Sequence, residues 1–154
     1  MGEPAWRVVL LLAGAFRDGV DALHVELAEQ GHPEARPLHG FALQAIGPDG
    51  CTINELGQRL GVTKQAAAKT AAGLERAGYL TREPVPGDRR AVRLRRTPRA
   101  EDLLVASEAG FERVAERWRH QLGPTRYDAL VDALATIAGD RPVGDLPGWL
   151  TQRP

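Results

Sequence analysis

The sequence predicts a mainly α-helical protein that carries one small two-stranded β-hairpin. Apolar residues recur at steps of three and four over both ends of the chain, which is the helical period. Only between Tyr79 and Arg95 does the pattern alternate as it does in strands. A length of 154 residues with 43% hydrophobic residues is ordinary for a folded globular chain.

The first part of the chain predicts two helices. A continuous apolar stripe runs from Trp6 to Leu27, enough for about six helical turns. Residues 29–37, which hold Gly31, Pro33 and Pro37, break this helix. A shorter helix is expected over residues 38–46, before the breaker run 47–50.

The middle of the chain predicts two short helices joined by a tight turn. Thr52 and Glu55 have the spacing of a capping box, which starts a helix over residues 53–60. Gly61 permits a sharp turn. Thr63 is a suitable N-cap for a second helix that runs to about Ala77 and ends at Gly78.

The hairpin is expected to follow directly. Strands are predicted over residues 79–83 and 91–95, linked by residues 84–88. Val92 and Leu94 share one face of the second strand, whereas Arg93 and Arg95 share the other. The hairpin is therefore basic on one side.

Two helices are predicted after the hairpin. The first runs from Pro98 to Leu122 with Gly110 as a weak point, and Gly123-Pro124 ends it. The second begins near Thr125 and carries apolar residues as far as Ile137. The tail after residue 139 is expected to pack only through three apolar residues, which are Leu146, Trp149 and Leu150.

Charge is divided sharply along the chain although the net charge is zero. Between residues 51 and 99 there are 11 Lys or Arg against 4 Asp or Glu, whereas the rest holds 9 basic against 16 acidic residues. A basic middle between acidic ends is typical of a module that binds a polyanion. The two short helices within it make DNA binding the first hypothesis.

The second short helix has two different faces on a helical wheel. Lys64, Gln65, Ala68, Lys69, Ala72 and Arg76 fall on one side, and Ala66, Ala67, Thr70, Leu74 and Ala77 on the other. Small residues allow close approach to base edges, and Lys and Gln can donate to guanine and adenine. The alternative is an alanine-rich packing helix with a solvated charged face, and the adjoining basic hairpin favours DNA.

The run INELGQRLGVTKQAAAKTAAGLERAGYLTREPVPGDRRAVRLRRTP resembles the winged helix-turn-helix of MarR-type transcriptional regulators. Its most specific part is the hairpin GDRRAVRLRRTP, and the flanking helices also match. The resemblance implies that Asp88 braces the wing, that Arg90 enters a minor groove and that Arg89 lies near the backbone. The candidate DNA-binding residues are Thr63, Lys64, Gln65, Ala68, Lys69, Arg76, Arg89, Arg90, Arg93 and Arg95.

This chain departs from the family pattern at three places. Ala100 stands where a Gly often follows the wing, and the recognition helix is unusually rich in alanine. Arg96 stands where an apolar residue is common, and we expect its side chain to be exposed.

The expected organisation is a helical dimerisation region, residues 1–30 and 100–154, around a DNA-binding domain, residues 38–99. The apolar stripes of the terminal helices favour a homodimer that binds a palindromic double-stranded operator; a monomer with folded-back terminal helices is the alternative. The resemblance further implies a cytoplasmic repressor that is relieved by a small-molecule effector. Its pocket would lie between the dimer helices and the DNA-binding lobe, with Phe16, His32, His39 and Phe41 as candidate lining residues.

Other functions find less support in the residues. The histidines lack the spacing of a metal site, and no catalytic or nucleotide-binding motif is present, so we expect no metal, no cofactor and no enzyme activity. Cys51 is expected to be a small half-buried residue at a turn. No apolar run is long enough to span a bilayer, and no membrane partner is expected. Two alternatives stay open: a winged helix that binds protein only, and a metal- or redox-gated sensor.

Overall fold

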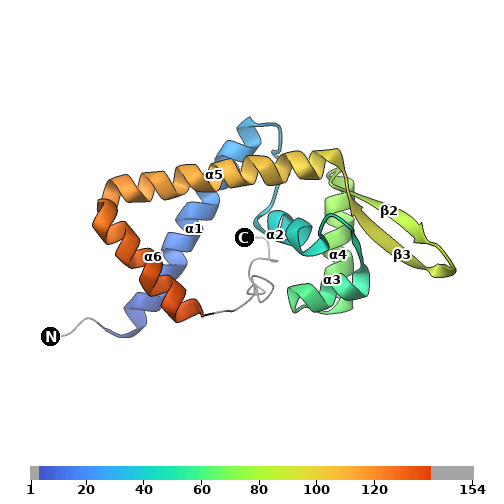
Figure 1. Ribbon diagram of the computed structural model, residues 1–154, viewed down its shortest axis with the longest axis horizontal. Helices are drawn as coiled ribbons and strands as arrows, with labels where there is room; N and C mark the ends of the chain where they lie inside the picture. The colour runs from blue at the N-terminus through green and yellow to red at the C-terminus, as the bar shows by residue number, and fades with distance from the viewer. Residues whose placement is uncertain (1–3, 140–154) are drawn as a thin grey trace.

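The computed structural model describes residues 4–139 and confirms the mainly α-helical fold (Figure 1). In chain order the elements are α1 (Trp6–Glu29), α2 (Pro37–Ile46), β1 (Cys51–Thr52), α3 (Ile53–Leu60), α4 (Lys64–Arg76), β2 (Leu80–Val85), β3 (Asp88–Arg96), α5 (Pro98–Leu122) and α6 (Pro124–Ala138). No helix within these residues has both the length and the apolar character needed to cross a membrane. The predicted contacts of Leu146, Trp149 and Leu150 lie outside the described residues.

Helix α5 runs along the molecule and connects its two ends (Figure 1). The short helices and the β-hairpin lie at its beginning, α6 lies at its end, and α1 crosses it between them. Gly110, which we predicted to be a weak point of this helix, is instead buried at the crossing. A Cβ at this position would overlap Cδ1 of Leu23 on α1, so the glycine allows the two helices to approach closely.

The main core lies where α2, α3, α4 and the sheet meet the start of α5. Its largest fully buried side chains are Tyr79, Leu43, Ile46, Leu56, Leu74, Leu94, Leu103, His32 and Cys51. Leu23 and Leu27 of α1 join the same cluster. The core therefore fixes the short helices and the hairpin onto the long helices.

The sheet has three strands, in the order β1-β3-β2, and not the two that we predicted. Cys51 pairs with Leu94 and Thr52 with Arg93, antiparallel. A strand of two residues is too short to show alternation, and its partner lies more than 40 residues away in the chain. This pairing holds the hairpin against the start of α3.

The hairpin is also longer than predicted. Strand β2 continues to Val85 and β3 begins at Asp88, with an irregularity in the register between Pro84 and Val85. Because β2 is an edge strand, the missing N–H of Pro84 costs no hydrogen bond inside the sheet. The hairpin therefore extends well beyond the core (Figure 1).

Candidate nucleic-acid interface

The turn between α3 and α4 is built by the residues that the sequence singled out. Thr52 Oγ1 accepts from the Glu55 amide at 3.3 Å, and the Glu55 carboxylate accepts from the Thr52 amide at 2.7 Å. Hydrogen bonding of the Glu55 carboxylate to the backbone amide of Thr52, and then to the Thr52 side chain, holds the pKa of Glu55 below its ordinary value. Gly61 ends α3 with a φ of 64°, and Thr63 Oγ1 accepts from the Ala66 amide at 3.1 Å to start α4.

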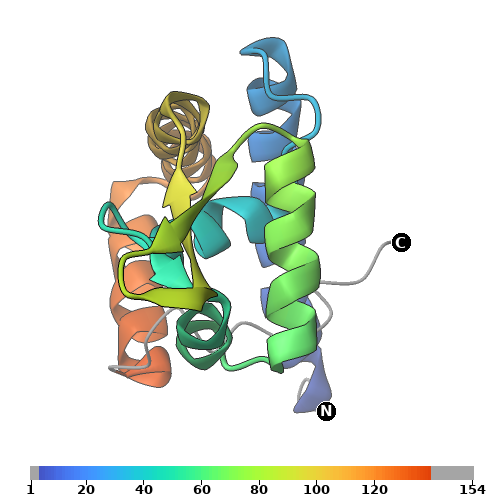
Figure 2. The same ribbon diagram turned by 90° about the vertical axis from the view of Figure 1, so that its right-hand side faces the viewer.

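Helix α4 has one buried and one exposed face, as predicted from the wheel. Ala67, Ala71 and Leu74 are completely buried against the core. The opposite face carries the long polar side chains, and the exposed ones are Lys64, Gln65, Lys69 and Arg76, with Thr63 exposed just before them. Ala68 and Ala72 are half-buried between these groups. Figure 2 shows α4 at the surface beside the hairpin.

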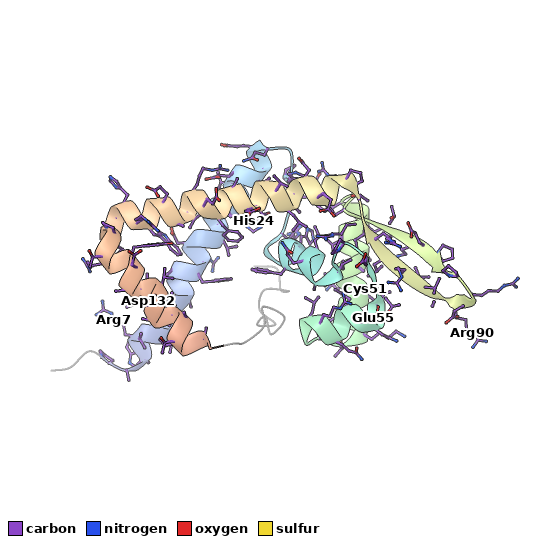
Figure 3. All side chains as sticks on the ribbon, viewed as in Figure 1. Arg7, His24, Cys51, Glu55, Arg90 and Asp132 are labelled. Carbon is purple, nitrogen blue, oxygen red and sulfur yellow. The ribbon has the colours of Figure 1, made fainter. Side chains whose placement is uncertain are left out.

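The tip of the hairpin is shaped by Asp88. Gly87 takes a φ of 83° in the turn, and the Asp88 carboxylate accepts from the backbone amide of Arg90 at 2.9 Å. The exposed side chains of Arg89 and Arg90 follow directly, and Figure 3 shows Arg90 extending away from the body of the protein. This geometry fits the bracing role predicted for Asp88.

The other two hairpin arginines among the candidate DNA-binding residues, Arg93 and Arg95, have partners within the protein. Arg95 donates to the Glu83 carboxylate across the hairpin at 2.9 Å. Arg93 lies 3.4 Å from the carbonyl oxygen of Gly50 and 3.5 Å from that of Asp49. Both guanidinium groups therefore brace the base of the hairpin, in contrast to those at its tip.

Several exposed cations on α4 and the hairpin tip have no ion-pair partner among the described residues. Within residues 4–139, the exposed cations without an ion-pair partner include Lys64, Lys69, Arg76, Arg89 and Arg90. Nearby arginines are neutralised, as in Arg82 with Glu75 and Arg99 with Glu34. A surface of unpaired cations beside small alanines is suited to a phosphate backbone with grooves.

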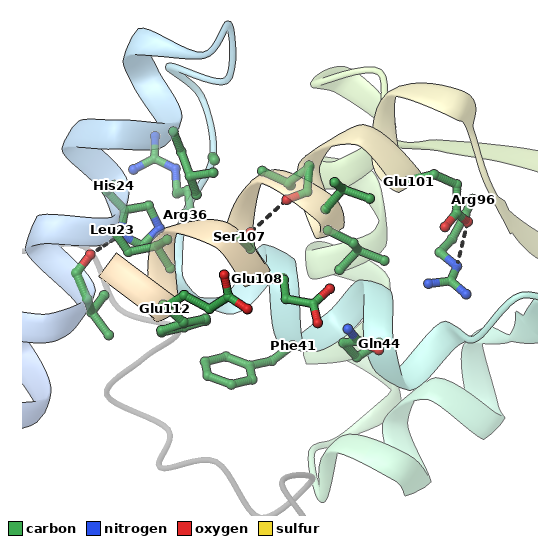
Figure 4. A pocket seen from close by; sticks show the side chains of 18 of the residues that line it. Leu23, His24, Arg36, Phe41, Gln44, Arg96, Glu101, Ser107, Glu108 and Glu112 are labelled. Atoms are coloured by element: carbon green, nitrogen blue, oxygen red, sulfur yellow. Dashed lines mark hydrogen bonds and ion pairs between the residues drawn. The ribbon is translucent and has the colours of Figure 1, made fainter. Parts of the chain in front are cut away.

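A second candidate site is a cavity of about 960 Å³ between α1, α2 and α5. It has the place predicted for an effector pocket, and Phe41 lines it as expected. Phe16, His32 and His39 are not among its lining residues. Of the four candidate residues, Phe41 thus lies in the lining of this cavity (Figure 4).

His32 and His39 are both buried, and each has its own polar contacts. Nδ1 of His32 lies 3.0 Å from the Tyr79 hydroxyl, and its Nε2 lies 2.8 Å from the Asp102 carboxylate. His39 Nδ1 accepts from the Arg36 amide at 3.3 Å. Burial, together with the nearby charges of Arg36 and His24, lowers the pKa of His39 to about 4. His39 is therefore a neutral acceptor at the start of α2.

Arg96 contradicts the expectation that it is exposed. Only 9% of its side chain is accessible, and it lines the cavity near Glu101, with its Nε 3.1 Å from a carboxylate oxygen of that residue. The sign of this burial in the sequence was that Arg96 stands where an apolar residue is common. A cation at such a position needs polar neighbours or a ligand.

Cys51 is fully buried, and not half-buried as we expected, and this burial raises the pKa of its thiol. No group of three His, Cys, Asp or Glu side chains that could hold a metal ion occurs in the part of the chain that the structure describes.

Comparison with known proteins identifies the arrangement. Residues 37–91, from α2 to the first part of β3, match the model of the MarR family. The match covers the helix-turn-helix and the first part of the wing, which are the segments that carried the resemblance in the sequence. It confirms the predicted resemblance to MarR-type transcriptional regulators.

Solved structures of MarR-type proteins share the fold over nearly the whole chain. The transcriptional regulator Tm0710 from Thermotoga maritima is 27% identical, with a TM-score of 0.60, over 87% of this chain and 93% of its own. FabT from Streptococcus pneumoniae, in complex with DNA, is 19% identical, with a TM-score of 0.69, over 87% and 94%. Wild-type MarR from E. coli is 17% identical, with a TM-score of 0.66, over 90% and 100%. The winged helix-turn-helix fold is thus confirmed.

Proposed function

We propose that this protein is a MarR-family transcriptional regulator, a homodimer that binds a palindromic DNA operator and represses transcription until a small molecule binds. The observation that carries the DNA-binding part is the set of unpaired cations on α4 and the hairpin tip. These groups lie on one side of the molecule, with the wing projecting beyond the core (Figures 1 and 2). The FabT structure in complex with DNA has the same fold, which supports this use of the surface.

Helix α4 is proposed to lie in the major groove. Its alanines allow close approach, while Gln65 and Lys69 can donate to base edges. The free amides at the start of the helix, near Lys64, are suited to a phosphate oxygen. Thr63 and Ala68 complete the surface that faces the bases, and Arg76 lies further along the helix, where a phosphate contact is favoured.

The wing is proposed to reach the adjacent minor groove with Arg90, while Arg89 contacts the backbone. Asp88 fixes the turn that presents both residues. Arg93 and Arg95 are assigned a weaker role, because carbonyl oxygens and Glu83 already engage their guanidinium groups. An arginine in a narrow minor groove is favoured by the negative potential there.

Dimerisation is supported by apolar side chains that the single chain leaves exposed. Trp6, Val9 and Leu10 of α1 are 61–64% accessible, and Ile137 of α6 is 73% accessible. No residue of α6 is buried. Both segments lie at the same end of the molecule, opposite the wing (Figure 1). A twofold partner would cover them and place the two α4 helices roughly 34 Å apart, one turn of duplex DNA.

The DNA-binding proposal is tested by selecting binding sites from a random duplex library and measuring affinity against salt. We expect an inverted repeat whose half-sites are about 10 base pairs apart. Replacing both wing-tip arginines (Arg89→Ala with Arg90→Ala) should weaken DNA binding. The plot of the logarithm of the binding constant against the logarithm of salt concentration should become shallower by about one for each phosphate that the variant no longer neutralises. The control is Arg126→Ala, at an exposed arginine on α6, which should change neither the affinity for DNA nor the slope against salt.

Other outcomes would favour the alternatives. Absence of any salt-dependent duplex binding would contradict DNA binding and favour a winged helix that contacts protein only. Loss of DNA binding after zinc addition or thiol oxidation would favour a metal- or redox-gated sensor instead of an effector pocket.

The dimer is tested by sedimentation velocity. Ile137→Asp places a charge in the proposed interface and should shift the protein toward monomer. Thr81→Asp, at an exposed position on β2 in the wing, is the matched control and should stay dimeric. A wild-type protein that sediments as a monomer at all concentrations would refute this part of the proposal.

A further inference from the structure

Both lysines of the sequence lie on the same short helix. Of the 20 Lys and Arg residues, 18 are arginines, and the two lysines are Lys64 and Lys69 of α4. An arginine side chain keeps its proton in a protein, whereas the amine of a lysine is a nucleophile that can be acylated or methylated. The side-chain amines of this sequence are therefore all placed on the helix that we propose to enter the major groove.

Both amines are accessible to a reagent. Each lysine is exposed, and neither has an ion-pair partner among residues 4–139. Ala68 and Ala72, their neighbours on the outer face of the helix, have side chains too short to cover an ammonium group. Glu75 is the one carboxylate of α4, and it accepts a hydrogen bond from Arg82 of β2 at 2.9 Å. No acidic side chain of the helix itself is thus available to neutralise the lysines.

We propose that Lys64 and Lys69 are acylation sites and that their acylation weakens the binding of DNA. The donor carries an activated acyl group on a phosphate or on a phosphate-bearing thiol, and acetyl phosphate and acetyl coenzyme A are the probes of this class. This inference rests on the proposed function, because it adds a means of regulating the proposed DNA-binding surface.

The surroundings of the two lysines favour an anionic donor. Arg76 of α4 and the wing-tip residues Arg89 and Arg90 are also exposed, and they have no ion-pair partner in the described part of the chain. Helix α4 and the hairpin lie side by side at the surface (Figure 2). A cluster of unpaired cations raises the local concentration of anions. The same positive field that attracts a DNA backbone therefore attracts the phosphate groups of the donor to the amines.

The reaction is the transfer of an acyl group from sulfur or oxygen to nitrogen. The lysine ammonium first gives one proton to water, and its amine nitrogen then attacks the acyl carbon. A C–N bond forms while the C–S or C–O bond of the donor breaks, and the bonding electron pair leaves with the thiol or phosphate. The second proton of the amine passes to this leaving group. The product is a neutral amide, so each reaction removes one positive charge from α4.

Loss of these charges affects α4 and leaves the wing as it was. An amide lacks the charge-assisted hydrogen bonds that an ammonium makes to phosphates and base edges. We expect the acylated protein to bind its selected operator at least about tenfold more weakly. The dependence on salt should become shallower by about one for each lysine that contacted a phosphate. Bound DNA should in turn protect the lysines from the donor, because the two events oppose each other.

The test is treatment of the full-length protein with acetyl phosphate or with acetyl coenzyme A. Peptide mass mapping locates the acetyl groups, and the affinity for the selected operator is measured as the acetylated fraction grows. We expect acetylation of Lys64 and Lys69, a slower reaction when the operator is bound, and a progressive loss of affinity. The two donors, used separately, distinguish an acyl phosphate from an acyl thioester as the source.

Three variants separate the chemistry from the charge. Lys64→Arg with Lys69→Arg keeps both charges without the amines, so treatment should not change the DNA affinity that this variant has beforehand. Lys64→Gln with Lys69→Gln imitates the neutral product and should bind DNA weakly without treatment. The matched control adds Arg126→Lys, at an exposed position on α6, to the double arginine variant. It should be acetylated at position 126 with no change in DNA affinity.

Three results would overturn the proposal: no acetylation of Lys64 and Lys69, an acetylated wild type that binds the operator as tightly as before, or an equal loss of affinity in the treated arginine variant. These results leave the proposed DNA binding intact, because the untreated protein still binds its operator. A wild type that binds no duplex would refute the DNA-binding proposal itself, and the mapping, which needs no DNA, would still decide whether the lysines react.

Discussion

The buried His39 predicts a loss of stability in mild acid that a single substitution should remove. Burial and the neighbouring positive charges lower the pKa of His39 from 6.5 to about 4 in the folded protein. The unfolded chain takes up a proton near pH 6.5, whereas the folded protein does so only near pH 4. The contribution of neutral His39 is therefore present above pH 6.5 and is lost as the pH falls toward 4.

The size of the effect follows from the difference between the two pKa values. At about 1.4 kcal/mol per pH unit, a difference of some 2.5 units amounts to about 3 kcal/mol at pH 4. His39→Asn keeps an acceptor near the Arg36 amide and removes the titration. The free energy of unfolding of the wild type, relative to this variant, should fall by about 3 kcal/mol between pH 6.5 and 4.

Urea unfolding at several pH values, at one protein concentration, measures this difference. All other side chains are the same in both proteins, so their contributions cancel in the comparison. His120→Asn, at an exposed position on α5, is the control and should keep the wild-type dependence. A difference between the wild type and His39→Asn that stays constant with pH would refute the reasoning.

Three further predictions concern the frame that holds the recognition helix and the wing. Gly50→Ala should destabilise the fold by about 1–3 kcal/mol more than Gly47→Ala, as measured by thermal unfolding. Both glycines have a φ of 74°, but only at Gly50 would a Cβ overlap the Leu94 carbonyl oxygen. Thr52→Ala should cost about 1 kcal/mol in urea unfolding through loss of the N-cap of α3, and Thr52→Ser should recover most of it. The buried Cys51 thiol should react slowly with a disulfide reagent in the native protein and rapidly in urea, and fast native labelling would contradict its burial.

Local signals predicted much of the fold. Thr52 with Glu55, and Thr63, act within three residues along the chain, and the structure uses them as the sequence indicated. The faces of α4 were likewise readable, because helical periodicity decides which side meets the core. The bracing role of Asp88 was implied by the family resemblance, and the contact itself is also local, because the side chain binds an amide two residues away.

Features that depend on distant partners were not predictable in this way. The direction of the Arg96 side chain depends on how the end of β3 meets α5 and the cavity. His32 is buried because Tyr79 and Asp102, 47 and 70 residues away, supply its polar partners. Strand β1 exists only through its pairing with β3. No periodicity in a single segment contains this information.

The length of helix α5 determines how far a structural change in one part of the protein is transmitted to another. It begins two residues after β3 ends and runs without interruption for 25 residues, a length of about 37 Å. We expect any tilt of this rod to occur about Gly110, because α1 packs directly against it there. Gly110 lies about 18 Å from the start of the helix, so a tilt of about 5° would move the wing end by about 1.5 Å. A small change where α1 crosses α5 would thereby displace the base of the wing.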